Sequence, residues 1–365
     1  MKSYMSNQAI NKEKMKFFWK KKTIISFVLS IFVLFLHMSS FTQYDIAGTQ
    51  YEGLLNFLYI FLQKSFVVLA VPLFFIISGA TTFRNYTNRD YPKKLASRVK
   101  SLLIPYLIWN TINLLYAIIT SYTFISNYFV GREKFIISLP NILLGIFFYK
   151  CYGPFWFIFN LMVFTIFLPL INLLISKKIA GISAIIALLI LQFFNIKLPE
   201  AIFFESESLV YYMFGCYIGK HHFDLFSSKT NTLIRAIGGV VFLMITVVFC
   251  MQGYGLLSII EVPRIIIKTV YSISFWIMAD CVIEKIAQKG FMSDSFIIYA
   301  THNTLKAIIL KIFYMLMPKH PLMSIVSFVM CSILTLAIIC LFCAFMKKYL
   351  PKIYAIISGA NINKK

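Results

Sequence analysis

The sequence is poor in charge, and especially in acidic charge. Only 13% of its 365 residues are Asp, Glu, Lys or Arg, which is about half the usual share of a soluble protein. Hydrophobic residues make up 60% of the chain. So little polar surface cannot cover a water-soluble particle, and a chain this apolar does not stay disordered. These shortages predict a protein that folds in a lipid bilayer.

Metal-binding motifs and acidic partners for the basic residues are also scarce. The closest cysteine pair, Cys340 and Cys343, stands alone in an apolar run, where small buried side chains are expected and not metal ligands. Lys and Arg number 35 against 13 Asp and Glu. In a membrane protein such an excess gathers in cytoplasmic loops. We therefore expect no metal site and no nucleic-acid partner.

Apolar runs separated by polar loops predict an all-α protein, a polytopic bundle of about ten transmembrane helices. Segment 136–149 is too short to cross and is expected to be interfacial or re-entrant. The first span lacks a cleavage site and is expected to remain in the protein. The predicted spans are 23–41, 64–83, 102–122, 154–175, 179–196, 201–219, 236–252, 262–283, 295–316 and 322–346.

The distribution of basic residues predicts the orientation of these spans. Placing the N-terminus in the cytoplasm puts most Lys and Arg residues on that side, as the positive-inside rule requires. An even number of crossings then returns the C-terminus to the cytoplasm. The predicted organisation is a basic cytoplasmic segment at 1–22, a transmembrane domain at 23–346 and a basic cytoplasmic tail at 347–365.

Ionisable side chains inside predicted spans are costly and are therefore functional candidates. His37, toward the outer end of its span, can accept and return a proton near neutral pH. His302 falls in the inner half of its own span. For both, the alternative is a neutral histidine that hydrogen-bonds a neighbouring helix. Asp280 needs a partner of opposite charge that the sequence does not name.

Two further groups of polar residues lie near predicted span ends. Glu261 and Arg264 stand one helical turn apart and are expected to pair at the external interface, as a structural pair or as part of an acceptor cleft. The basic loop between the second and third spans contains Arg84, Arg98 and Lys100. These side chains could bind the phosphates of a cytoplasmic donor or anchor the loop at lipid headgroups.

Several stretches together resemble the integral membrane acyltransferase-3 family. They are the apolar run that ends in His37, Val71-Pro72-Leu73-Phe74-Phe75 through Ser78-Gly79, the basic run into Pro105-Tyr106, Phe155-Trp156-Phe157, and Ile298-Tyr299 followed by His302. Members are ten-span proteins that acylate sugars, surface polysaccharides, peptidoglycan or secondary metabolites. The resemblance implies a multi-pass protein of the bacterial plasma membrane.

The resemblance also implies roles for particular residues. His37 corresponds to the histidine regarded as catalytic. His302, Glu261 and Arg264 are candidate supporting residues because of their positions in the predicted spans, and not through the resemblance. The implied co-substrate is acyl-CoA, with acetyl-CoA the first choice, and no tightly bound cofactor is expected.

Arg84, Arg98 and Lys100 would meet the phosphates of acyl-CoA, and the acceptor would be a sugar or glycan. The family usually has a basic residue eleven positions before the histidine, where this chain has Ser26. The nearest basic residue is Lys22. The competing interpretation is a transporter or glycan exporter that uses His37, Asp280 and Lys306 as coupling groups.

Overall fold

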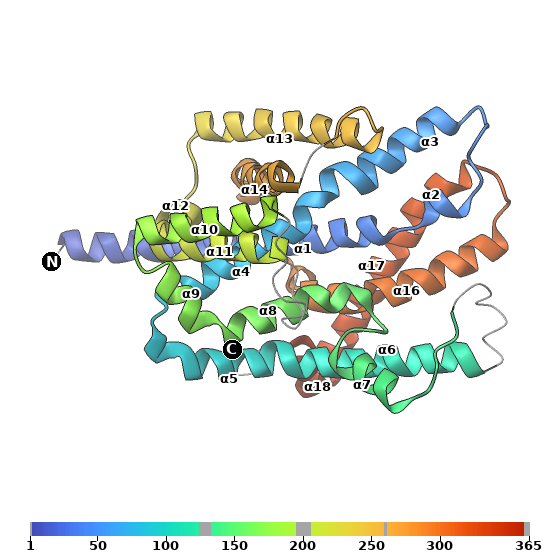
Figure 1. Ribbon diagram of the computed structural model, residues 1–365, viewed down its shortest axis with the longest axis horizontal. Coiled ribbons are helices and arrows are strands. Elements are labelled where there is room, and N and C mark those ends of the chain that lie inside the picture. The colour runs from blue at the N-terminus through green and yellow to red at the C-terminus, as the bar shows by residue number, and fades with distance from the viewer. Residues whose placement is uncertain (1, 124–132, 195–205, 259–260, 361–365) are drawn as a thin grey trace.

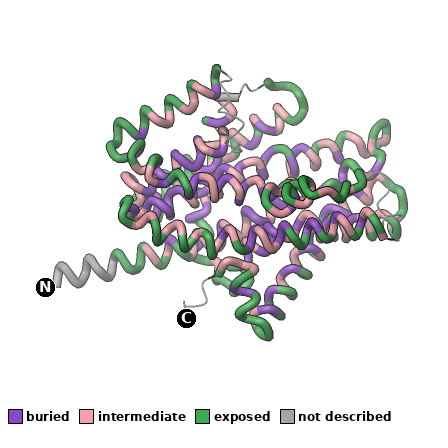
Figure 2. Tube along the Cα trace, turned by 60° about the horizontal axis from the view of Figure 1, so that its bottom comes forward, coloured by how far each residue is buried: buried purple, intermediate pink, exposed green. Residues whose placement is uncertain are grey.

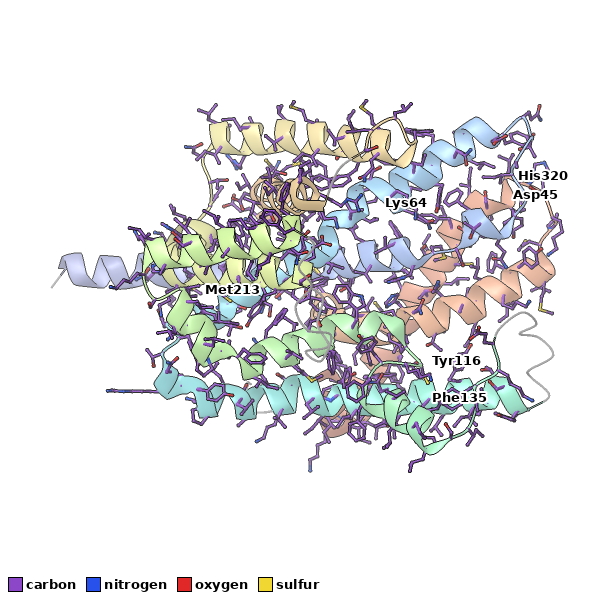
Figure 3. The ribbon with its side chains drawn as sticks, viewed as in Figure 1. Asp45, Lys64, Tyr116, Phe135, Met213 and His320 are labelled. Carbon is purple, nitrogen blue, oxygen red and sulfur yellow. The ribbon has the colours of Figure 1, made fainter. Side chains whose placement is uncertain are left out.

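The computed structural model describes residues 2–123, 133–194, 206–258 and 261–360, and all regular structure in these ranges is helical. This confirms the all-α class. The helices form one elongated bundle (Figure 1). The end that holds the N-terminal half of α1 (Lys2–His37), α5 (Tyr91–Arg98) and α12 (Phe223–Ser227) is called the basic end. Asp45 and His320 mark the opposite end (Figure 3).

Within the described residues, seven segments are long and apolar enough to cross a membrane. They contain most of the residues of the predicted spans one to three and seven to ten, and thus confirm these as helices. The segments are Asn11–Gln43, Glu52–Phe83, Asn88–Tyr122, Thr232–Gly253, Pro263–Ile283, Gly290–Leu316 and Met323–Tyr349.

Several of these segments consist of consecutive short helices. After α2 (Ser40–Gln43), the second segment joins α3 (Glu52–Tyr59), the π-helix η1 (Ile60–Ser65), the 3₁₀-helix η2 (Phe66–Leu69) and α4 (Ala70–Phe83). The third joins η3 (Asn88–Asp90), α5, the π-helix η4 (Val99–Leu103) and α6 (Ile104–Tyr122). The others are formed by α13 (Thr232–Gly253), α14 (Glu261–Met278), α15 (Asp280–Ile283), η8 (Gly290–Asp294), α16 (Ser295–Leu316) and α17 (Met323–Tyr349).

Among the remaining three predicted spans, two differ from straight crossing helices in their described residues. The predicted span 154–175 is divided into η6 (Gly153–Phe155), α8 (Trp156–Ile166) and α9 (Leu168–Leu174), with a bend of 70° between α8 and α9. Pro169, in the first turn of α9, explains the bend because proline lacks the N–H and clashes with the preceding turn. The number of crossings beyond seven stays a prediction.

The predicted span 179–196 forms a short helix in its described part. α10 (Lys178–Phe193) has 16 residues, or about 24 Å of helix, against roughly 30 Å of hydrocarbon. Of the predicted span 201–219, α11 (Ser206–His221) is the described part, and residues 201–205 lie outside the described residues. The nine-residue α7 (Leu139–Phe147) agrees with the expectation that segment 136–149 is too short to cross.

Three glycines allow α4 and α11 to pack backbone against backbone. A Cβ on Gly215 would lie 2.3 Å from the Ile76 carbonyl oxygen, and one on Gly219 would lie 2.4 Å from that of Ala80. A Cβ on Gly79 would lie 2.5 Å from the Tyr212 carbonyl oxygen. Small residues four apart are the usual basis of such contacts in membranes. Because residue 76 meets 215 and residue 80 meets 219, the two helices run in the same direction.

A buried ion pair joins α1 to α15 at the basic end. Lys21 Nζ lies 2.6 Å from Asp280 Oδ1, with side-chain exposures of 1% and 0%. Thr230 donates its backbone N–H and its hydroxyl to the other carboxylate oxygen, both at 2.9 Å. Lys21 also lies over the Trp276 ring, 4.2 Å from its centroid. The partner that Asp280 requires therefore comes from the basic N-terminal segment.

The tail that follows α17 folds back onto the bundle. Pro351 opens α18 (Pro351–Ser358), and Trp109 Nε1 of α6 donates a hydrogen bond of 2.9 Å to the Ile357 carbonyl oxygen. Gly359 adopts φ +65°, and a Cβ there would lie 2.2 Å from the Ser101 carbonyl oxygen. This part of the predicted tail is thus a helix that packs on α6.

Much of the outer surface of the bundle is apolar. Leu243, Met244 and Val247 of α13 are 63%, 64% and 58% exposed, and exposed residues follow the outer faces of many helices (Figure 2). In water, such faces would form large apolar patches. In a bilayer they contact lipid chains. Together with the long apolar helices, this surface defines a multi-pass membrane protein.

Candidate active site

His37 is the last residue of α1, at a break inside an apolar helical segment. Met38 and Ser39 leave the helical conformation before α2 begins. A helix that stops within a membrane leaves carbonyl oxygens that need donors. The histidine that sequence reasoning singled out thus lies at a discontinuity of the span, with its side chain half-buried.

Two side chains from other helices satisfy these carbonyl oxygens. Gln63 of the π-helix η1 donates to the carbonyl oxygens of Phe35 and Met38. Lys306 of α16 donates to the carbonyl oxygen of His37. A π-helical turn often marks a functional position. Here the π-helix η1 contains Gln63, whose side-chain amide caps the end of α1. The break is therefore stabilised by tertiary contacts.

His302 lies beside His37. The centroids of the two imidazole rings are 5.5 Å apart, whereas the sequence had suggested different depths for them. The correction has a simple cause, because α16 begins well within the bundle. Ser30 Oγ donates to the Ser295 carbonyl oxygen at 3.3 Å, so residue 295 is level with residue 30. Seven residues further along each helix, the two histidines meet.

The hydrogen bonds of His302 define its tautomer. Its Nδ1 lies 2.8 Å from the Tyr299 carbonyl oxygen, which can only accept, so Nδ1 carries the hydrogen. The buried Nε2 has no hydrogen-bond partner among the described residues and presents its lone pair. Tyr152 donates its hydroxyl to the same carbonyl oxygen at 2.9 Å. This arrangement leaves one fixed acceptor nitrogen in the centre of the bundle.

The cation near the histidines comes from α16. The ammonium of Lys22 lies 4.9 Å from the centroid of the Trp19 ring, on the side of the basic end, so it does not reach toward His37. The Ser26 carbonyl oxygen accepts a hydrogen bond of 2.9 Å from Ser30 Oγ. Lys306 supplies the positive charge at His37 instead. Sequence analysis had considered Lys306 only for the transporter interpretation.

A cavity of about 260 Å³ lies at the level of His37. Its wall includes Leu36, which precedes His37, together with Pro72 and Trp156. Glu207 and Lys268 also line it and form an ion pair of 2.8 Å, with side-chain exposures of 29% and 20%. Sequence analysis missed this pair, although the presence of both charges within predicted spans was a signal.

The expected pair of Glu261 and Arg264 stays a prediction, because the Glu261 side chain lies outside the described residues. Arg264 is half-buried. Lys268, one turn further along α14, donates to Glu207. The ion pair that this part of α14 makes at the cavity therefore joins it to α11.

Two of the three predicted donor-binding residues gather at the end of α4. The Arg98 guanidinium donates to Thr82 Oγ1 at 2.8 Å, and Arg84 lies over the Phe223 ring at 5.2 Å. Lys94 adds a hydrogen bond of 3.3 Å to the Thr82 carbonyl oxygen. Lys100 is exposed and has no contact to Thr82.

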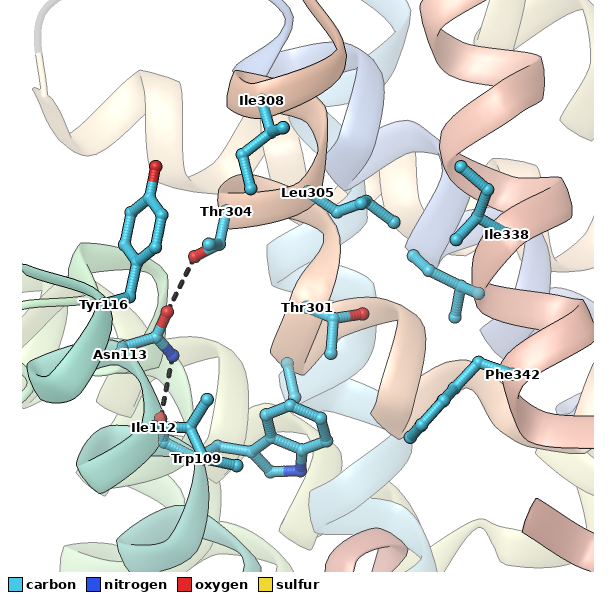
Figure 4. A pocket seen from close by; sticks show the side chains of 12 residues that line it. Trp109, Ile112, Asn113, Tyr116, Thr301, Thr304, Leu305, Ile308, Ile338 and Phe342 are labelled. Atoms are coloured by element: carbon cyan, nitrogen blue, oxygen red, sulfur yellow. Dashed lines mark hydrogen bonds between the residues drawn. The ribbon is translucent and has the colours of Figure 1, made fainter. Parts of the chain in front are cut away.

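A second cavity, of about 320 Å³, lies between α6, α16 and α17 (Figure 4). Thr301 and Thr304, on either side of His302, line it in part. Its polar contact is a 2.7 Å hydrogen bond from Thr304 to Asn113, whose amide in turn donates to the Trp109 carbonyl oxygen at 2.8 Å. This apolar lining suits a hydrocarbon chain and not a phosphate or a sugar.

The site thus consists of two adjacent histidines at a helix break, and basic side chains gather at one end of the bundle. These features are those of a membrane-embedded protein that can perform proton-transfer chemistry. Comparison with known proteins identifies the family. Residues 26–344 match the family model of the acyltransferase domain, so the chain belongs to the acyltransferase-3 family.

One curated relative has a stated biological role. The chain is 26% identical over 202 residues to the succinoglycan biosynthesis protein ExoH of Rhizobium meliloti (strain 1021), a match that covers 52% of this chain and 50% of the relative. The alignment thus spans about half the length of that protein. No solved structure matches the chain.

Proposed function

We propose that this protein is a membrane O-acyltransferase that moves an acyl group, with acetyl as first choice, from acyl-CoA to a hydroxyl of a sugar or cell-surface glycan. The observation that carries the proposal is the pair of adjacent imidazoles at the break of α1, within a chain matched to the acyltransferase domain over residues 26–344. Succinoglycan biosynthesis by the relative supports a glycan acceptor. The proposed location is the bacterial plasma membrane, with the basic end in the cytoplasm.

In this mechanism, His37 acts as the general base. It accepts the proton of the acceptor hydroxyl as the oxygen attacks the thioester carbon. The new carbon–oxygen bond forms, the carbon–sulfur bond breaks, and the proton passes to the departing thiolate of CoA. His302 presents Nε2 beside this centre and can orient the hydroxyl or share the proton.

The donor is proposed to enter from the basic end, where Arg84 and Arg98 would bind its phosphates. Arg98 is anchored at Thr82, while Pro72 lines the cavity at the level of His37. A rise of about 1.5 Å per residue puts these two positions of α4 roughly 15 Å apart along the helix. An extended thioester arm has to bridge this length, which is about half the roughly 30 Å of the hydrocarbon layer.

The test compares wild type with His37→Ala in nanodiscs. Labelled acetyl-CoA and a membrane glycan extract are supplied, and label transfer to glycan is measured. We expect transfer to fall by about 10²–10⁴-fold, the usual contribution of a general base. His320→Ala is the control, because this histidine is exposed at the opposite end of the bundle.

Equal transfer by the wild type and by folded His37→Ala would contradict the proposed role of His37. Absence of transfer with several acyl-CoA donors, combined with His37-dependent glycan transport in proteoliposomes, would favour the exporter interpretation. The exporter interpretation used Asp280 as a coupling group. The Asp280 carboxylate already forms an ion pair with Lys21 and accepts a hydrogen bond from Thr230, which disfavours this role.

A further inference from the structure

The cavity lined by Glu207, Lys268 and Trp156 has a chemical character that general-base catalysis at His37 does not explain. Its walls come from five separated parts of the chain: α1, η2 with the start of α4, α8, α11 and α14. An ion pair inside an apolar bundle costs desolvation energy and is by itself weak evidence for a stabilising role. These two charged groups remain partly accessible, at 29% and 20%. A ligand that hydrogen-bonds to both Glu207 and Lys268 would explain why these two charged groups line the cavity.

The hydrogen bonds around Glu207 hold it in place while leaving capacity for a ligand. Its Oε1 accepts from the Tyr211 hydroxyl and from Lys268 Nζ. An ionised carboxylate has about four acceptor positions and an ammonium has three donor hydrogens. Ser208, the next residue, is held by Asn160 Nδ2 at 3.0 Å. The cavity therefore offers acceptors, donors and the ring of Trp156 side by side.

We propose that this cavity is the acceptor subsite and binds one hydroxyl-bearing sugar ring, an assignment that rests on the proposed function. The Glu207 carboxylate accepts hydrogen bonds from ring hydroxyls, Lys268 donates to a ring or hydroxyl oxygen, and Trp156 stacks on the apolar face of the ring. Leu36 in the wall brings the cavity to α1 one residue before His37, whose own side chain is not among the lining residues. The attacking hydroxyl therefore has to extend from the ring in the cavity toward His37.

Charge and size exclude the other ligands of the reaction from this cavity. The Lys268 ammonium is already neutralised by Glu207, so the cavity offers no net positive charge to the phosphates of acyl-CoA, which have the basic end as their proposed site. The ion pair disfavours a lipid chain, since an acyl chain cannot replace the lost hydration of either charge. A volume of about 260 Å³ lies just below the roughly 300–1,000 Å³ of pockets for drug-sized ligands. The enclosed volume thus accommodates a single ring of the acceptor.

The test measures sugar binding directly and does not depend on turnover. Wild-type protein in nanodiscs, prepared without glycoside detergents, is titrated with the methyl glycosides of glucose, galactose, N-acetylglucosamine and glucuronic acid. Saturation-transfer NMR reports binding. We expect at least one glycoside to bind, and binding to weaken at least tenfold in the double variant Glu207→Gln, Lys268→Met. Trp156→Leu, which leaves the ion pair intact, is expected to have the same effect.

The matched control is the double variant Glu284→Gln, Lys229→Met. It removes an ion pair of 2.6 Å whose side chains are 54% and 41% exposed, and sugar binding should stay unchanged. If no glycoside binds to the wild type, if either folded cavity variant binds as well as the wild type, or if acetyl-CoA displaces the sugar, the proposal is overturned.

His37→Ala separates this proposal from the proposed function. If the acceptor subsite is correct, His37→Ala still binds the glycoside. A His37→Ala protein that both binds sugar and transfers acyl groups like the wild type would overturn the role of His37 and leave the subsite standing. Suppose instead that His37→Ala loses transfer and that changes at Glu207, Lys268 and Trp156 leave glycoside binding unaffected. This result would support the role of His37 and overturn the acceptor subsite.

Discussion

The buried pair of Lys21 and Asp280 gives the sharpest stability prediction. In Asp280→Asn, the side chain keeps its shape and an oxygen for Thr230, but the ammonium of Lys21 loses its counter-charge at 2.6 Å in a site with 1% exposure. Removal of one partner of a buried pair costs about 3–5 kcal/mol because it leaves an uncompensated charge. We expect Asp280→Asn to lose this amount of unfolding free energy.

The assay is equilibrium unfolding in mixed micelles, with Glu284→Gln as the control. The pair of Lys229 and Glu284 has the same 2.6 Å separation but is 41% and 54% exposed, so its loss should cost about 0–1 kcal/mol. The double variant Lys21→Met, Asp280→Asn removes the orphaned charge and should recover most of the stability. A loss below about 1 kcal/mol in Asp280→Asn, no more than an exposed pair is worth, would refute this reasoning.

Three further predictions concern packing, donor binding and the histidine centre. Gly215→Val should destabilise the protein by at least about 1–3 kcal/mol through overpacking in the same unfolding assay, because its Cβ would lie 2.3 Å from a backbone oxygen of α4; unchanged stability would contradict the close contact. Arg98→Gln should raise KM for acetyl-CoA more than Lys100→Gln does, since Arg98 is fixed at the end of α4 and Lys100 is exposed; initial-rate kinetics would show the reverse order if this is wrong. The Tyr152 hydroxyl lies 3.3 Å from His302 Nδ1 and is expected to help position this ring. Tyr152→Phe should therefore lower kcat about two- to tenfold, the worth of one hydrogen bond of roughly 0.5–1.5 kcal/mol, with KM values unchanged; an unaltered kcat would contradict this role.

The sequence by itself determined the membrane class and the seven long apolar helices. Hydropathy suffices here because each crossing helix satisfies its own backbone hydrogen bonds, so its position follows from local composition. His37 was identifiable as a candidate because an ionisable group inside a span is costly, and its role stays a prediction. The motif residue Gly79 lies at a close helix contact, as is common for small residues in membranes. Short and bent helices were less predictable. The bend before Pro169 makes two short helices out of one apolar run.

The composition of the site was decided only by the tertiary structure. His37 and His302 are 265 positions apart in the sequence, and the depth at which α16 begins depends on how η8 and α1 pack. Lys306 as the cap of α1, Lys21 as the partner of Asp280 and Lys268 as the partner of Glu207 each join separate helices. Hydropathy contains no information about which helices are neighbours. Long-range packing brings these charges together, because in a low-dielectric interior each buried charge requires a specific partner.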